Sequence, residues 1–248
     1  MNNLDVTWNK TGGNSGVLKF VSDIEGVATT YANLYRRVLL QSTPSMAIAA
    51  IRCLVDDKPC KNLFQAVPGL TDSLIDINNK LHNATFDVSY EDEGDEKNVK
   101  SFTVSIALNG KTMVSDLCGD KANLIADSED DIKLSLVSKD ETLTNVVGNH
   151  SIMLQMFFVK GSGYSQRDIN KQTLEAVVGS SELDSWIVTD SQHRSVVNIS
   201  YNVTNRLGKQ IIELGVTSFQ NNIEDVINHC TEIIVGQVSK ITASSQEE

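Results

Sequence analysis

Short runs of alternating apolar and polar residues recur along the chain, and this two-residue period predicts β-strands. Residues 4–24 contain two such runs, LDVTW and GVLKFVSDI, which predict a strand pair turned at KTGGNSG. Further strands are predicted at residues 47–55, 85–90, 100–108, 132–137, 151–159, 195–203 and 211–219. The polar stretch Lys160–Asp184 lacks this alternation, so we expect it to be mainly loop.

Three segments instead carry apolar residues at the three-to-four-residue spacing of an amphipathic helix. They comprise residues 27–42, 70–83 and 223–241, and the last of them has a wide apolar stripe. Strands with a few separated helices, and no repeating strand–helix–strand unit, indicate an α+β fold.

The order of these elements predicts two domains. Residues 1–52 and 185–248 hold the first strand pair, the first helix and the last helix, and we expect them to form one domain of strands with two main helices. Residues 53–184 are expected to form an inserted, strand-rich second domain. A chain of 248 residues is long enough for each part to have a hydrophobic core.

The helix predicted at residues 27–42 has two distinct faces when successive residues are turned by 100°. The side expected to pack into its own domain consists of Val27, Tyr31, Leu34, Tyr35 and Val38. The outward side offers Asn33, Arg36, Arg37 and Leu40. This pattern alone fits either a solvated face or a binding face, because arginine beside an exposed leucine is typical of interface hot spots.

The net charge of the chain is −11 and its isoelectric point is about 4.8. Binding a nucleic-acid backbone with the overall surface would need lysine and arginine to replace counterions, so the charge argues against it, although one local basic patch remains compatible. The densest acidic run, EDEGDEK at Glu91–Lys97, fits a solvated loop or a docking segment for a basic partner.

Four cysteines are present at Cys53, Cys60, Cys118 and Cys230. They form no CxxC pair and fit no zinc-ligand spacing, so we expect reduced and mostly buried thiols and no metal site. The chain shows no apolar run long enough to span a bilayer and no signal-peptide pattern at its start. These features predict a reducing, cytoplasmic location without membrane contact.

An enzyme acting alone is the rival interpretation from another class. The sequence contains no GxSxG, GxxxxGK[ST], HExxH or GxGxxG motif. The histidines are scattered singly at His82, His150, His193 and His229. We therefore expect no catalytic residue and no cofactor site.

The segment TYANLYRRVLLQSTPSMAIAAIRC, Thr30–Cys53, resembles the signature of the alpha subunit of bacterial-type DNA-directed RNA polymerase. That signature reads roughly T-L-G-N-A-L-R-R-x-L-L-S-S-x-P-G-x-A. The matching residues are Thr30, Asn33, Arg36, Arg37, Leu39, Leu40, Ser42, Pro44 and Ala47. Two glycines of the signature are replaced here, by Ala32 and Ser45.

Further segments resemble the same family in the same order along the chain. They are NLFQAVPGLTDSLIDINNKL, VKGSGYSQRD and HRSVVNISYNVTNRLGKQIIELGV. Residues 84–150 match only in their strand pattern. Any one segment would be weak evidence, but their order over most of the chain makes the resemblance specific.

The resemblance implies a non-catalytic assembly subunit whose homodimer is the platform on which the beta and beta-prime subunits assemble. It implies a dimer interface formed by Tyr31, Leu34, Tyr35, Ile223, Ile227, Cys230 and Ile234. It also implies that Asn33, Arg36, Arg37 and Leu40 dock one large subunit. Gly163 and Tyr164, in the GSGYS loop, would help to bind beta-prime or would form a purely structural turn. The nucleotidyltransferase active site would lie in the large subunits, without direct nucleic-acid contact by this chain.

Two points of the resemblance leave alternatives open. Typical members carry a separate carboxy-terminal DNA-binding domain, which we expect this chain to lack, either through shortening or because its lineage has none. The asparagine-rich composition suits an AT-biased genome, such as that of a plastid, an endosymbiont or a virus. The homologous subunit of an archaeal or eukaryotic-type polymerase would pair with a smaller, different partner, but LYRRVLLQSTPS is closer to the bacterial type.

Overall fold

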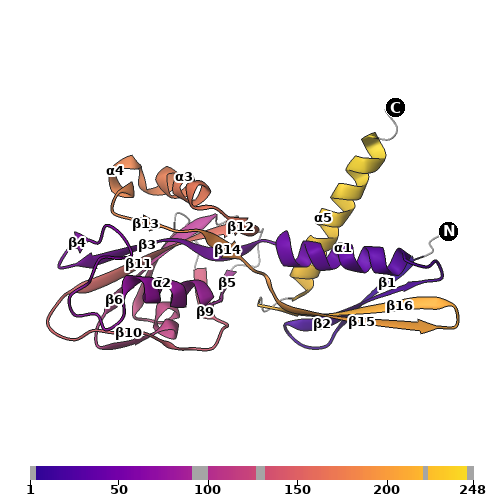
Figure 1. Ribbon diagram of the computed structural model, residues 1–248, viewed down its shortest axis with the longest axis horizontal. Helices are drawn as coiled ribbons and strands as arrows, with labels where there is room; N and C mark the ends of the chain where they lie inside the picture. Colours follow the sequence, from indigo (N-terminus) through magenta and orange to yellow (C-terminus); the bar gives the residue numbers. More distant parts are fainter. Residues whose placement is uncertain (1–3, 91–99, 127–131, 220–222, 245–248) are drawn as a thin grey trace. The chain divides into compact units, whose positions relative to one another are not determined.

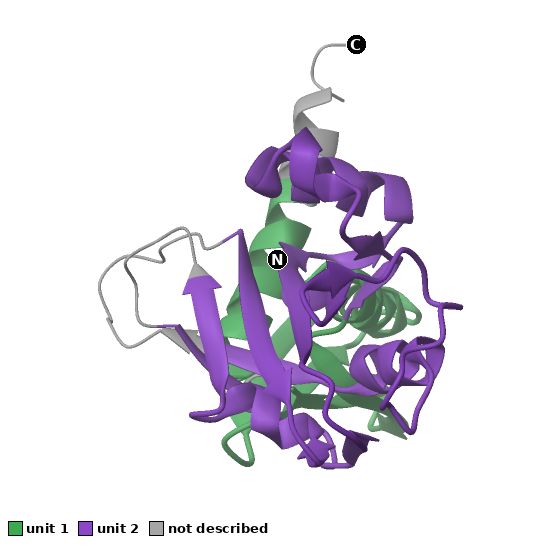
Figure 2. Ribbon diagram, turned by 90° about the vertical axis from the view of Figure 1, so that its left-hand side faces the viewer, with its two compact units in different colours: residues 1–44, 194–248 green, residues 45–193 purple. Residues whose placement is uncertain are grey.

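The computed structural model describes residues 4–90, 100–126, 132–219 and 223–244. The acidic run at Glu91–Lys97 lies outside the described residues. The chain forms two compact units, unit 1 from residues 1–44 and 194–248 and unit 2 from residues 45–193 (Figure 2). The structure is a mixed α+β fold in which strands predominate.

The boundaries of the two units differ from the predicted divisions at residues 52/53 and 184/185. Strand β3, Ser45–Val55, pairs along its whole length with β11, Ile152–Gly161, and so belongs entirely to unit 2. Residues 187–188 also pair with β3. Hydrogen bonding between distant strands, which a pattern along the sequence does not reveal, therefore sets the boundaries.

Unit 1 is a four-stranded antiparallel sheet with two helices on one face (Figure 1). In sheet order the strands are β1 (Leu4–Lys10), β2 (Ser15–Ser22), β16 (Lys209–Ser218) and β15 (Val196–Arg206). The helices are α1 (Val27–Gln41) and α5 (Ile223–Ser244). Alternate residues of β2 and β16 are buried beneath them, as the two-residue period predicts.

Helix α1 packs on the sheet through a stripe that differs in part from the predicted core side. Its buried residues are Ala28, Ala32, Tyr35, Val38 and Leu39. Tyr31 is instead 38% exposed, and Val27 and Leu34 are only partly buried. The helical periodicity predicted that large apolar side chains would form the core side of α1. In the structure, two alanines are the residues of α1 that are buried most completely. A small side chain allows a helix to lie close to the surface beneath it.

Unit 2 is built on a larger sheet with helices on both faces. The strands on its main path are β13 (Ile187–Val188), β3, β11, β6 (Ser101–Leu108) and β8 (Ala122–Ala126), with β4 (Lys58–Pro59) beside β3. Helix α2 (Leu74–Asn83) covers one face, and α3 (Arg167–Val178) and α4 (Ser180–Leu183) cover the other. Smaller antiparallel pairs join β7 (Lys111–Met113) to β10 (Thr142–Asn145), β5 (Phe86–Tyr90) to β9 (Ile132–Leu136), and β12 (Gly163–Ser165) to β14 (Ser191–His193).

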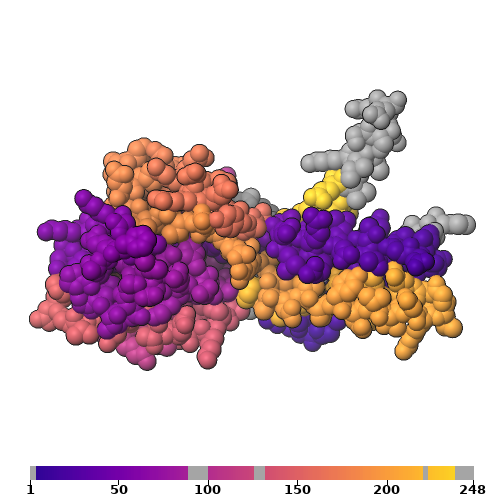
Figure 3. Space-filling model, viewed as in Figure 1, coloured from indigo at the N-terminus to yellow at the C-terminus, as the bar shows by residue number. Residues whose placement is uncertain are grey.

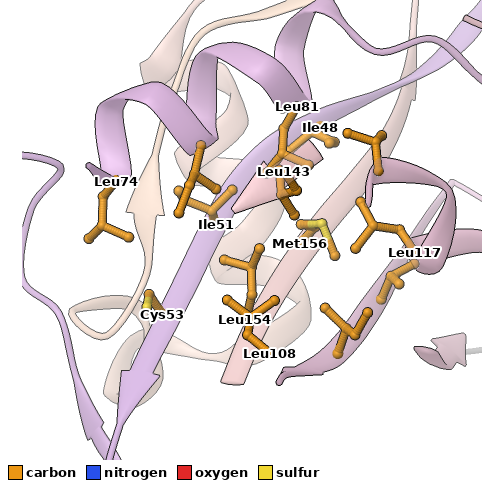
Figure 4. Packing of buried hydrophobic residues seen from close by; sticks show 14 of the residues in the cluster. Ile48, Ile51, Cys53, Leu74, Leu81, Leu108, Leu117, Leu143, Leu154 and Met156 are labelled. Atoms are coloured by element: carbon orange, nitrogen blue, oxygen red, sulfur yellow. The ribbon is translucent and has the colours of Figure 1, made fainter. Parts of the chain in front are cut away.

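The main core of unit 2 lies between α2 and the sheet (Figure 4). Leu74 and Leu81 of α2 face Ile51 of β3, and Leu154 and Met156 of β11 complete the layer. All five side chains are at most 1% exposed. Ser73 begins α2 by accepting a hydrogen bond from the backbone N–H of Asp76, which fixes the start of the helix.

The prediction that residues 160–184 are mainly loop is wrong, because they contain β12, α3 and α4. Helix α3 buries only Asn170 and Leu174 completely. A polar residue therefore occupies one of the two buried positions, and the apolar period that signals a helix is lost. Asn170 is tolerated there because its amide donates to the carbonyl of Thr189 at 2.8 Å and to the hydroxyl of Ser191 at 3.1 Å.

Gly16 provides a test of packing in unit 1. An added Cβ would lie 2.2 Å from Cη2 of Trp8 and 2.9 Å from the backbone oxygen of Asn9. We predict that Gly16→Ala lowers the free energy of unfolding by about 1–3 kcal/mol, because the Trp8 ring must move. Chemical denaturation followed by tryptophan fluorescence measures this change. Gly13→Ala is the control, since nothing lies within 4 Å of the added atom; equal stability of the two variants would contradict the prediction.

Candidate functional site

The outward face of α1 carries the four residues that the sequence placed there. Asn33, Arg36, Arg37 and Leu40 are all exposed, and Leu40 retains 41% of its accessible surface. Within the described parts of the chain, neither guanidinium forms an ion pair. Figure 3 shows α1 at the surface of unit 1. We call these four residues the arginine face.

The end of α1 that carries the arginine face is firmly anchored. The hydroxyl of Thr43 donates to the carbonyl of Leu39 at 2.8 Å and also bonds to the hydroxyl of Ser195, the residue before β15. Ser195 is held in turn, because its carbonyl accepts from the Ser218 hydroxyl at 2.8 Å and the Phe219 N–H at 3.0 Å. The last turn of α1 is therefore tied to both long strands of the sheet.

The opposite side of α1 is fixed by contacts within unit 1. The ring of Tyr35 meets that of Phe20 edge to face, with centroids 5.3 Å apart. Its hydroxyl lies 3.5 Å from that of Thr231 on α5. Leu39 is 1% exposed. These contacts determine which side of the helix faces outward, so the arginine face is preformed before any partner binds.

Most residues predicted for the dimer interface are already covered inside unit 1. Ile223, Ile227, Cys230 and Ile234 of α5 are at most 5% exposed, and Tyr35 is 8% exposed. The wide apolar stripe of α5 packs against α1 and the sheet of its own chain, which the sequence pattern could not distinguish from packing against a second copy. Of the predicted residues, Tyr31 is exposed and Leu34 is partly buried, whereas the others are buried.

The second predicted docking element is the short strand β12. Gly163 has a φ of +65°, a left-handed conformation that glycine adopts without strain. Tyr164 follows it and is 62% exposed, so its ring points away from the core. The Asp190 carboxylate raises the pKa of Tyr164, and the Tyr164 hydroxyl lowers the pKa of Asp190. No motif in the sequence links Asp190 to Tyr164.

Two of the cysteines and two of the histidines have surroundings typical of structural residues. Burial raises the pKa of Cys53 and of Cys230 to about 12, so these thiols stay protonated and unreactive near neutral pH. His82 bonds to the hydroxyl of Thr189 at 3.0 Å, and His193 bonds to the carbonyl of Ser45 at 2.8 Å. Over the residues that the structure describes, no three His, Cys, Asp or Glu side chains gather as a metal site requires.

Among the described helices, none combines the length and the apolar character that crossing a bilayer requires.

The fold defines a class of protein, a mixed α+β chain of two compact units in which one unit is a four-stranded sheet with two helices. The chain belongs to the RNA polymerase Rpb3/Rpb11 dimerisation domain family, whose model matches residues 22–198. The match includes all of α1 and all of unit 2, and it ends in β15. It confirms the kind of family that the α1 signature indicated.

Several curated relatives have the name "DNA-directed RNA polymerase subunit alpha". The subunit of Aster yellows witches'-broom phytoplasma is 27% identical over 185 residues, which are 75% of this chain and 49% of the relative. That of Desulforamulus reducens is 26% identical over 188 residues, 76% of this chain and 51% of the relative. That of a Mycoplasma species is 25% identical over 149 residues, which are 60% of this chain and 38% of the relative. The chain thus spans about half the length of the first two relatives.

Proposed function

We propose that this chain is a non-catalytic assembly subunit of a bacterial-type DNA-directed RNA polymerase. Family membership and the names of the similar bacterial proteins support the proposal. The observation that carries it is the arginine face, because Arg36 and Arg37 stand exposed and without a described ion pair on a rigidly held helix end. In this role the chain works in the cytoplasm without a cofactor, and the large subunits perform nucleotidyl transfer.

On this proposal unit 1 is the dimerisation and assembly domain, and unit 2 is its inserted, strand-rich domain. A second copy would cover the apolar side chains that unit 1 leaves accessible, which include Tyr31 on α1 and Val235 on α5, 38% and 58% exposed. A symmetric pair would bury the same patch on both copies. The dimer contact is therefore proposed for the outer surfaces of α1 and α5, beside the stripe that packs inside unit 1.

The arginine face is the proposed contact for the beta subunit. An arginine guanidinium can bind a carboxylate through two parallel hydrogen bonds, and Leu40 supplies an apolar contact beside it. The acidic charge of the chain fits a subunit that lies away from the nucleic acid. Gly163 and Tyr164 are the proposed contact through which the other copy binds beta-prime.

The alternative is a polymerase subunit of archaeal or eukaryotic type that pairs with a different, smaller protein. The description of the matching family includes such a pair, Rpb3 and Rpb11. The bacterial names of the similar proteins favour the homodimer. Light scattering on the purified chain separates the two, because a monomer at micromolar concentration would favour the alternative.

We predict that Tyr31→Glu weakens the homodimer while unit 1 stays folded. A carboxylate buried in an interface without a partner costs several kcal/mol, so the dissociation constant should rise at least about tenfold. Analytical ultracentrifugation measures the constant. Gln41→Glu adds the same side chain at another exposed position of α1 and should leave the constant unchanged. If both variants dimerise with the same dissociation constant, Tyr31 does not lie in the interface.

We predict that Arg37→Ala abolishes capture of the beta subunit but leaves the fold and the dimer intact. Because Arg37 is exposed, its removal should change the stability by no more than about 0.5 kcal/mol. Loss of a partly desolvated charged contact typically costs about 2–5 kcal/mol of binding, or roughly 30- to 4000-fold. A pull-down of purified beta by the dimer, combined with a thermal midpoint, measures both quantities.

The matched control for this experiment is Arg206→Ala, which removes an exposed arginine from β15 of the same unit. It should bind beta like the wild-type chain. If the Arg37→Ala dimer captures beta as well as the wild-type dimer does, Arg37 is a solvated side chain without a docking role. If the thermal midpoint of the Arg37→Ala variant falls strongly, Arg37 instead stabilises the fold.

A further inference from the structure

Helix α3 exposes some of its apolar side chains and buries others. Leu174 is completely buried and packs with Phe157 and Trp186 in the core on this face of the unit 2 sheet. Ile169 and Val177 of the same helix are instead 55% and 41% exposed. They are eight residues apart, which places them within about 80° of each other around the helix axis. The outward side of α3 therefore carries apolar surface near both of its ends.

The charged residues of α3 lie on a different side of the helix from these apolar residues. At 100° per residue, residues 169, 172, 173, 176 and 177 fill an arc of about 140° without a charge. Arg167, Asp168, Lys171 and Glu175 all lie outside this arc. A helix face that meets only water is typically charged or polar. We call the uncharged residues of this arc, which all keep accessible surface, the α3 face: Ile169, Gln172, Thr173, Ala176 and Val177.

Hydrogen bonds hold α3 in place, so the α3 face is preformed. The backbone N–H of Arg167, the first residue of the helix, donates to Oδ1 of Asp190 at 2.7 Å. One turn further on, the buried amide of Asn170 donates to the Thr189 carbonyl at 2.8 Å and to the Ser191 hydroxyl at 3.1 Å. A face that is already fixed loses little conformational freedom on binding, which favours association.

The chain itself keeps the α3 face close to Tyr164, the proposed contact for beta-prime. Tyr164 is 62% exposed and precedes Ile169 by five residues, which can span at most about 18 Å. Ile169 and Val177 are about 12 Å apart along the helix axis. A protein interface of standard size covers about 800 Å² on each partner, a patch roughly 30 Å across. One interface can therefore include both Tyr164 and the α3 face.

We propose that the α3 face binds the beta-prime subunit, as an apolar extension of the contact at Tyr164. A second copy of the chain is the less suitable occupant, because its proposed contact lies on α1 and α5 of unit 1. The matching surface of beta-prime would be apolar and uncharged, since a charge placed against Ile169 or Val177 would lose its hydration without gaining a partner. This inference rests on the proposed function, because it requires beta-prime to bind unit 2.

The test measures the capture of purified beta-prime by the complex of the chain with beta. Ile169→Glu places a carboxylate on the α3 face in the first turn of the helix, where the helix dipole favours it. We expect the dissociation constant for beta-prime to rise at least about tenfold, because the carboxylate is desolvated in an apolar contact. Ile125→Glu is the matched control, since Ile125 on β8 of the same unit is also 55% exposed. It should bind like the wild-type chain.

Val177→Lys tests the other end of the α3 face with a charge of the opposite sign. A cation is favoured in the last turn of a helix, so α3 should still form, and the thermal midpoint of each variant verifies that it has folded. We expect a loss of capture similar to that of Ile169→Glu, because a charge of either sign weakens an apolar contact. If Val177→Lys captures beta-prime as well as the wild-type chain or better, the contact is not apolar, and the inference is wrong.

Three outcomes separate this inference from the proposed function. If Tyr164→Ala loses beta-prime while Ile169→Glu and Val177→Lys bind it normally, the inference is wrong and the proposed contact at Tyr164 stands. If all three variants bind normally, both the inference and that part of the proposed function are wrong. If Ile169→Glu instead weakens the homodimer in analytical ultracentrifugation, a second copy covers the α3 face, and the inference is overturned.

Discussion

The close packing of α1 on the four-stranded sheet of unit 1 determines what the molecule can present to a partner. Ala28 and Ala32 are completely buried against the sheet and α5, and Tyr35 and Leu39 continue the same stripe. Because these positions are fixed by packing, the helix cannot turn about its axis without opening cavities. The residues on the opposite side, which form the arginine face, must then face solvent. The hydrogen bonds of Thr43 fix the C-terminal end of α1.

The same packing separates two roles that the sequence pattern had combined. The apolar stripe of α5 stabilises unit 1 by covering α1 and the sheet. It is therefore part of the folded chain and would not be exposed in a monomer. The proposed contact with a second copy therefore uses other side chains, those of α1 and of the outer side of α5 that remain accessible. The buried apolar stripe of α5 stabilises unit 1, and only the accessible side chains of α1 and α5 are proposed to take part in association.

The sequence predicted features that depend on local periodicity and missed those that depend on pairing or polar burial. Strands β2, β11 and β16 and helices α1, α2 and α5 carry clear periods and were located within a few residues. Helix α3 was missed because Asn170 interrupts its apolar period, although its hydrogen bonds satisfy the buried amide. The exposure of the arginine face followed from the spacing along one helix. The pairing of Tyr164 with Gln192 did not, because it joins two strands that meet only in the folded chain.

The central claim is that the arginine face meets a large polymerase subunit. Its most direct test places a photo-cross-linking amino acid at position 40, on that face, and at position 207, a fully exposed hairpin tip that serves as the control. The chain would then be assembled with purified beta and beta-prime and irradiated. The account predicts an efficient cross-link to a large subunit from position 40 and little or none from position 207. Failure of position 40 to cross-link in a fully assembled complex would contradict it.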